Sequence, residues 1–133
     1  MTQKIAAWLF IGLLIPVIAL QLGLALGMPW GELAMGGQFP GQFPLPMRVA
    51  ALVQSALLLF IGAIVLAHSG VALKPLLPLS KRLMWGVVVL CALAAVLNLI
   101  TPSTKERDAW LPVAAGLLLC SAVVALCNRS KRQ

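Results

Sequence analysis

Long stretches without charged residues constrain this chain more than any other feature of its sequence. Residues 5–26, 49–73, 83–104 and 109–128 contain no Asp, Glu, Lys or Arg, and each stretch is at least 20 residues long. An α-helix rises about 1.5 Å per residue, so about 20 residues cross a hydrocarbon core of about 30 Å. Each stretch is therefore long enough to form one membrane-spanning helix.

The composition argues against a soluble globular domain. Of the 133 residues, 62% are hydrophobic and 10% are charged, whereas about 25% are charged in an average soluble domain. A soluble chain of this length could not bury so much apolar surface. We expect the first stretch to be retained rather than cleaved as a signal peptide, because it lacks a small-residue cleavage site and three further spans follow it.

Proline and glycine set the ends of the expected helices. Gly70 is typical of a helix C-terminus, Pro102 stops the third helix, and Pro112 is tolerated in the first turn of the fourth. The fold class that follows is an all-α integral membrane protein, a single four-helix domain made of two hairpins. The predicted helices cover about 5–26, 48–69, 83–101 and 109–127, with outer loops at 27–47 and 102–108 and an inner loop at 70–82.

The distribution of Lys and Arg predicts the orientation. Three of the ten basic residues lie on the outer side: Arg48 at the start of the second helix, and Lys105 and Arg107 in the second outer loop. The other seven lie beside the termini or in the inner loop: Lys4, Lys74, Lys81, Arg82, Arg129, Lys131 and Arg132. We expect the protein to lie in the inner (plasma) membrane. Since basic residues are enriched on the cytoplasmic side of membrane proteins, both termini are expected in the cytoplasm.

The basic residues also bear on partners. A net charge of +7 raises the question of nucleic acid, but the charges sit in short segments between apolar spans and form no stripe interleaved with aromatic residues. We therefore expect the lipid bilayer, through its anionic headgroups, to be the partner of these residues, and no nucleic acid.

Three side-chain amides are expected at the same depth, near the helix ends farthest from the termini. Gln21 lies near the end of the first helix, Gln54 near the start of the second, and Asn98 near the end of the third. An amide exposed to lipid is costly unless it is paired or reaches water. We therefore predict that the three amides point into a polar pocket that opens to the outside.

Residues of the outer loops and of the helix starts beside them complete the predicted binding set, which adds Glu32, Arg48, Glu106, Arg107 and Trp110. Glu106 stands out because it lies between two basic residues, close to the membrane boundary. The alternative is structural: interhelical amide hydrogen bonds contribute about 0.6 kcal/mol on average, and exposed ion pairs contribute little.

The remaining polar residues predict no cofactor and no metal. Cys91, Cys120 and Cys127 fall inside expected spans without a C-x-x-C pattern, and buried thiols usually pack as small hydrophobic groups. His68 stands alone at the end of the second helix, where a cation is favoured. No nucleotide-binding loop, nucleophile elbow or metalloprotease motif occurs, so no catalytic residue is assigned.

The two outer loops and the residues beside them carry a set of short motifs. These are Pro29-Trp30-Gly31, Gly36-Gly37, Pro40-Gly41, Leu45-Pro46, Arg48, Asn98, Thr101-Pro102-Ser103, Glu106-Arg107, Trp110 and Pro112. In this combination the chain resembles a group of small four-span bacterial membrane proteins known as hypothetical membrane proteins. The resemblance covers most of the chain and implies that both outer loops belong to the pattern of the group, but it implies no activity.

Three classes of function remain open. The first is a binding or transport protein for a small polar or amphiphilic solute, which would need a homo-oligomer to enclose enough space for transport. The second is an accessory subunit held against a larger membrane partner. The third is an enzyme of the outer leaflet in which Glu32 or Glu106 acts as acid or base.

Overall fold

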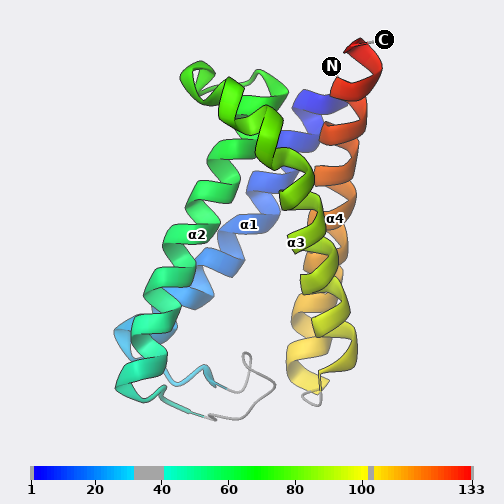
Figure 1. Cartoon of the computed structure of the whole chain (residues 1–133). Helices are drawn as coiled ribbons and strands as arrows, with labels where there is room; N and C mark the ends of the chain where they lie inside the picture. The colour runs from blue at the N-terminus through cyan, green and yellow to red at the C-terminus, as the bar shows by residue number, and fades with distance from the viewer. Residues whose placement is uncertain (1, 32–40, 102–103, 133) are drawn as a thin grey trace.

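The computed structural model describes residues 2–31, 41–101 and 104–132, with side chains described as far as Cys127. The described chain forms four long helices and one short 3-10 helix (Figure 1). Their bounds are α1 Thr2–Leu26, α2 Leu45–Ser69, η3 Lys74–Leu76, α3 Leu77–Ile100 and α4 Thr104–Arg132. Each α-helix is long and apolar enough to cross a membrane, which confirms the predicted all-α, four-helix architecture.

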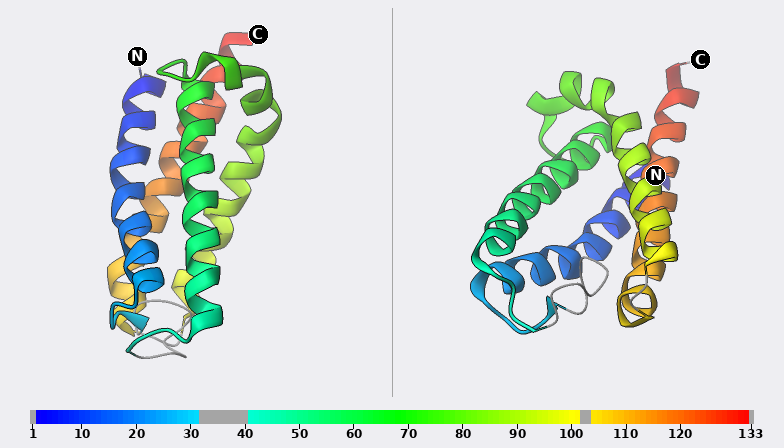
Figure 2. Two further views of the ribbon diagram at one scale, coloured as in Figure 1. Left: turned by 90° about the vertical axis from the view of Figure 1, so that its left-hand side faces the viewer. Right: turned by 60° about the horizontal axis from the view of Figure 1, so that its bottom comes forward.

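The helices form two antiparallel pairs, α1 with α2 and α3 with α4 (Figures 1 and 2). Both termini and the connection from α2 to α3 lie at one end of the molecule, which we call the terminal end. The connections within the two pairs lie at the other end, which we call the hairpin end. The pairs approach one another at the terminal end and diverge toward the hairpin end, as Figure 1 shows.

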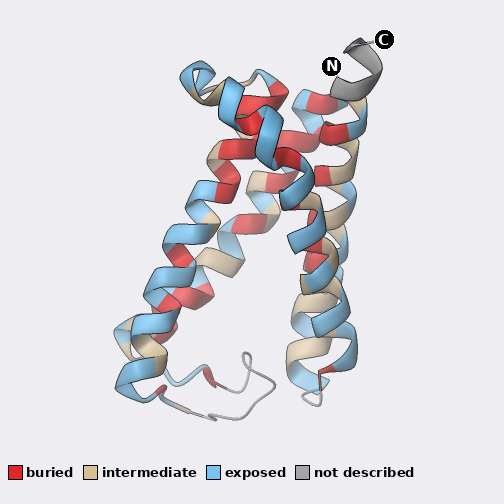
Figure 3. Cartoon of the chain, in the orientation of Figure 1, coloured by how far each residue is buried: buried red, intermediate tan, exposed pale blue. Residues whose placement is uncertain are grey.

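The distribution of buried residues follows this divergence (Figure 3). The main core draws on all four helices in their terminal halves and includes Phe10, Ile64, Met84 and Val124, all fully buried. A second cluster at the hairpin end contains residues of α1, α2 and the segment before α2, with α4 represented by the partly buried Trp110 alone. Four-helix packing is therefore confined to the terminal half of the described chain.

The helices start where proline occupies a first turn. Pro46 and Pro78 lie within the first two residues of α2 and α3, where the missing N–H would have no intrahelical partner. Gly70 ends α2 in the left-handed conformation, with φ 79°, and its N–H donates to the carbonyls at the helix end. Proline-containing segments that read as loop thus begin helices instead.

The predicted boundaries change accordingly. The third helix starts at Leu77 rather than near 83, so the expected loop at 70–82 shortens to 70–76 and itself contains η3. The fourth helix starts at Thr104 rather than 109, so most of the loop expected at 102–108 forms its first turn. Glu106 favours that start, because a carboxylate near a helix N-terminus interacts well with the backbone dipole.

Small residues permit close approach between helices in the terminal half. A Cβ added to Gly116 of α4 would lie 2.7 Å from Leu13 Cδ1 of α1. A Cβ at Gly62 of α2 would lie 3.1 Å from Leu14 Cδ2. By contrast, nothing lies within 4 Å of a Cβ added to Gly86 of α3. The two sites on α2 and α4 are therefore filled by side chains of α1.

Replacing Gly116 by leucine is expected to separate α1 from α4. Overpacking of this kind lowers the free energy of unfolding by about 1–3 kcal/mol. Gly86→Leu is the matched control, because the same side chain finds open space there. Circular dichroism during heating in a mild nonionic detergent should show a lower melting temperature for Gly116→Leu alone; equal melting temperatures would contradict the packing.

Candidate functional site

Two of the predicted amides lie on the inward faces of the first hairpin. Residues seven or eleven apart share one face of a helix. Gln21 follows the buried Leu14 by seven residues and is 9% exposed. Gln54 precedes the buried Ile61 by seven residues and Val65 by eleven, yet Gln54 is exposed. Gln54 thus lies on the core-facing side of α2 at a level where the two hairpins have diverged.

Asn98 occupies the corresponding face of α3. It follows the buried Cys91 by seven residues and Val87 by eleven, and is itself half-buried. Its Nδ2 donates to the carbonyl of Ala94, 2.8 Å away in the same helix. In the described chain, neither Gln21 nor Gln54 makes a side-chain hydrogen bond with another residue. The three amides share an inward orientation and a depth, but they do not bond to one another.

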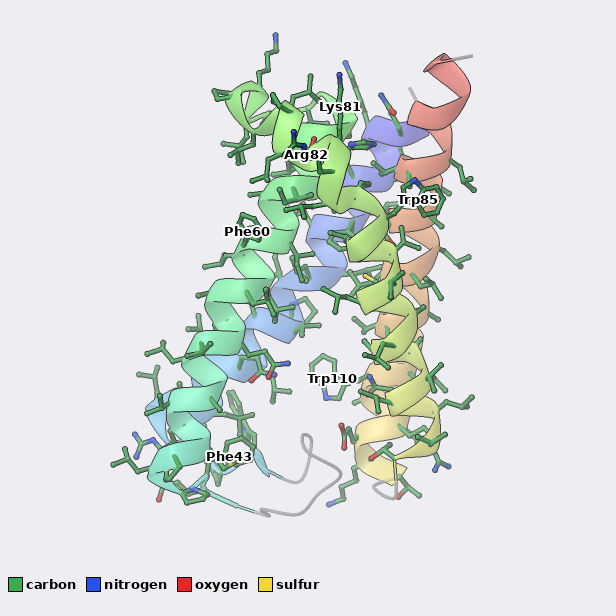
Figure 4. The ribbon with its side chains drawn as sticks, viewed as in Figure 1. Phe43, Phe60, Lys81, Arg82, Trp85 and Trp110 are labelled. Carbon is green, nitrogen blue, oxygen red and sulfur yellow. The ribbon has the colours of Figure 1, made fainter. Side chains whose placement is uncertain are left out.

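Trp110 is the side chain of α4 that reaches across the divergence. It precedes the buried Leu117 by seven residues and packs against the second cluster, which includes Leu20, Leu24 and Phe43. Figure 4 shows the indole projecting from α4 toward the α1–α2 pair. Its Nε1 is buried and has no hydrogen-bond partner among the described residues. Trp110 therefore joins the two hairpins through apolar contact and leaves its donor unused.

Thr101 ties the start of α4 to the end of α3. Its buried hydroxyl donates to Glu106 Oε2 at 2.9 Å, and its carbonyl accepts a hydrogen bond from Arg107 Nη2 at 2.7 Å. Arg107 Nε is buried without an acceptor in the described chain. Glu106 and Arg107, both predicted as binding residues, thus brace the turn, and Arg107 keeps one donor unused.

The other two predicted residues belong to the first hairpin. Arg48 Nε donates to the carbonyl of Ala25 at 3.0 Å, which joins the start of α2 to the end of α1. Its guanidinium also lies against Gly27, whose φ of 98° ends α1. Arg48 therefore closes the first hairpin, whereas Glu32 lies outside the described residues.

We call Gln21, Gln54, Asn98, Arg107 and Trp110 the hairpin-end site. Each helix contributes at least one of these residues from its inward face. Gln54 lies farthest from the hairpin end of its helix, nine residues or about 14 Å from the start of α2. A buried N–H without an acceptor costs about 1–3 kcal/mol. Arg107 Nε and Trp110 Nε1 are two such donors, on adjacent turns of α4.

A second polar cluster lies at the terminal end, where the sequence pattern points to His68 alone. Gln3, His68, Ser69 and Ser80 are all buried, and Gln3 Nε2 donates to the carbonyl of Ser69 at 3.2 Å. Ser80 Oγ donates to the Leu77 carbonyl at 2.7 Å and lies 3.5 Å from His68 Nδ1. Which of these two groups donates depends on the tautomer of the imidazole.

Helical periodicity could have revealed the role of Gln3. It lies eighteen residues, or five turns, before Gln21 and therefore on the same face of α1. Its position beside Lys4 places it at the edge of the charge-free stretch, where a polar residue reads as solvent-exposed. The cluster joins α1, α2 and α3, and its described members bond mainly to backbone carbonyls.

No model of a known protein family, no curated protein and no solved structure matches this chain.

Trp110→Ala should weaken the hairpin end by removing the contact between α4 and the second cluster. Truncation of a largely buried tryptophan lowers the free energy of unfolding by about 3 kcal/mol. Trp85→Ala is the matched control, because Trp85 is 46% exposed on α3. Thermal unfolding in detergent should separate the two variants; if Trp85→Ala is as destabilised as Trp110→Ala, the bridging contact is not what holds the hairpins.

Proposed function

We propose that this protein binds a small polar or amphiphilic solute at the hairpin-end site, from the outer side of the inner membrane. The observation that carries the proposal is the gathering of polar side chains on the inward faces of all four helices at the end where the hairpins diverge. Elsewhere on those faces the residues are mostly apolar and packed together. A polar set in such a position is useful only to a ligand, to water or to a partner chain.

The basic residues support the orientation that this function needs. Lys4, Lys74, Lys81 and Arg82 are exposed at the terminal end. At the hairpin end Arg48 and Arg107 donate to backbone carbonyls within the protein. Exposed basic residues near span ends favour the cytoplasmic side. We therefore place both termini in the cytoplasm and the hairpin end outside.

The surroundings of the site favour an amphiphile over a fully polar solute. Leu20, Leu24 and Trp110 form an apolar cluster beside the amides. Small-molecule sites combine apolar walls with a few polar groups that orient the ligand. A solute with an alkyl or aromatic part could contact this cluster while its polar group meets Gln21 and Gln54.

One observation favours the competing function, that of an accessory subunit. In the most apolar 18-residue stretch of the span that contains α3, Lys74–Ile100, 17% of the residues are buried within the molecule. The corresponding share is 33% in α1 and in α2. A helix so little covered by its own chain is suited to packing against another protein. Purification in mild detergent separates the cases: a monomer that retains one stoichiometric partner protein supports the accessory role, and a pure homo-oligomer supports solute binding or transport.

Cysteine labelling in intact cells tests the orientation. In a background with Cys91, Cys120 and Cys127 replaced by alanine, Gly41→Cys should react with an impermeant maleimide, because it lies in the connection at the hairpin end. Leu79→Cys, at the exposed start of α3, should react only after the cells are permeabilised. The opposite pattern would place the termini outside.

Gln54→Leu should abolish solute binding while the protein remains folded, because the amide is exposed and bonds to no described residue. Native mass spectrometry can count adducts of dodecyl phosphate, dodecyltrimethylammonium and dodecyl glucoside on the purified protein. Leu52→Val, on the opposite face of α2, is the control. Loss of the fold in Gln54→Leu would identify the amide as a packing contact instead.

A further inference from the structure

The unused donors of the hairpin-end site are concentrated on one patch of α4. Three buried side-chain polar atoms in the described chain lack a hydrogen-bond partner, and two of them are Arg107 Nε and Trp110 Nε1. Residues three apart on a helix are neighbours, with Cβ atoms about 5–6 Å apart. Native proteins leave few buried polar groups unpaired, so two donors side by side indicate a missing acceptor.

Existing contacts hold both side chains in place. Arg107 Nη2 is fixed to the Thr101 carbonyl at 2.7 Å, which ties the planar guanidinium to the end of α3. The indole of Trp110 is packed against the cluster of Leu20 and Leu24. Turning either N–H toward water would break one of these contacts. The donors are therefore positioned before any ligand arrives.

The carboxylates of the same turn do not supply the acceptor. Glu106 accepts a hydrogen bond from the Thr101 hydroxyl, and Asp108 is exposed. Neither carboxylate oxygen reaches Arg107 Nε, which stays without a partner in the described chain. The acceptor that fits both donors must come from outside these residues.

We propose that the ligand of this site carries an anionic oxygen group, a phosphate or a carboxylate, which accepts hydrogen bonds from Arg107 Nε and Trp110 Nε1. The inference rests on the proposed function and specifies its ligand class. Arginine forms short, charge-assisted bonds to such oxygens, and an indole N–H can only donate. A cationic headgroup offers no acceptor and would be repelled by Arg107.

The test compares probes on the full chain in a mild nonionic detergent, with native mass spectrometry measuring affinity. Dodecyl phosphate should bind at least tenfold more tightly than dodecyltrimethylammonium. Inorganic phosphate in the same titrations distinguishes a free anion from a headgroup: if it displaces dodecyl phosphate at similar concentrations, the anion alone is recognised. Equal binding of the phosphate and ammonium amphiphiles would overturn the inference.

Two conservative substitutions address the donors themselves. Arg107→Lys keeps the charge but removes Nε–H, and Trp110→Phe keeps an aromatic ring but removes Nε1–H. Each should weaken dodecyl phosphate binding about tenfold, the cost of one lost bond to a charged group. Arg82→Lys and Trp85→Phe make the same changes on exposed residues of the terminal half and should have no effect.

The outcomes separate this inference from the proposed function. Binding of dodecyl glucoside or dodecyltrimethylammonium that is lost in Gln54→Leu but unchanged in Arg107→Lys and Trp110→Phe would retain the binding site and reject an anionic ligand. Failure of every probe to bind would reject both. Because Arg107→Lys also risks the contact with Thr101, melting temperatures are measured for all variants, and Trp110→Phe decides if Arg107→Lys unfolds.

Discussion

Apolar side chains that the protein does not cover itself are the constraint on which this structure depends. No more than 33% of the most apolar window of any helix is buried within the molecule. Such surface would be stable against membrane hydrocarbon, which supplies no hydrogen bonds to the backbone. A helix satisfies its backbone groups within its own segment, and each of the four helices is long and apolar enough to cross a membrane. Because all four helices are apolar, the shapes of the side chains on their inward faces, and not their hydrophobicity, determine where the helices pack together.

The inward faces differ between the two ends of the molecule. In the terminal half, residues such as Phe10 and Met84 interdigitate, and Gly62 and Gly116 allow α1 to approach its neighbours closely. Toward the hairpin end α3 contributes nothing to the second cluster, and Trp110 is the residue of α4 that packs against it. The separation of the hairpins therefore follows from where close packing stops.

The number and type of helices could be predicted from the sequence because charge-free length is a strong and local signal. Boundaries were less predictable: Pro78 reads as a helix breaker, yet it lies in the first turn of α3, which starts six residues ahead of Leu83. The inward orientation of Gln21, Gln54 and Asn98 was predicted from the cost of exposing an amide to lipid, and their spacing from buried residues of the same helices agrees with it. Their binding role stays a prediction.

What the sequence could not reveal depends on tertiary contacts. Arg48 stays a predicted binding residue, and its Nε bonds to the Ala25 carbonyl, a partner set by how α1 meets α2. Periodicity places Gln3 on the inward face of α1, but it does not predict that Gln3 joins α1 to the end of α2 through the carbonyl of Ser69. In both cases the acceptor is a backbone carbonyl, which carries no signature in the sequence.

The polar cluster at the terminal end and the hairpin-end site differ in which of their hydrogen-bonding groups lack a partner. At the terminal end, the hydroxyls of Ser69 and Ser80 donate to carbonyls nearby in the chain, and the buried group without a partner among the described residues is an acceptor, Gln3 Oε1. At the hairpin end, the buried groups without a partner among the described residues are N–H donors of α4, Arg107 Nε and Trp110 Nε1. A ligand oxygen that reached these donors would supply the acceptor that they lack among the described residues. Ligand binding would then favour a state in which the two hairpins lie closer together. The ligand oxygens that accept hydrogen bonds from α4 would lie beside the second cluster, which belongs mainly to α1 and α2.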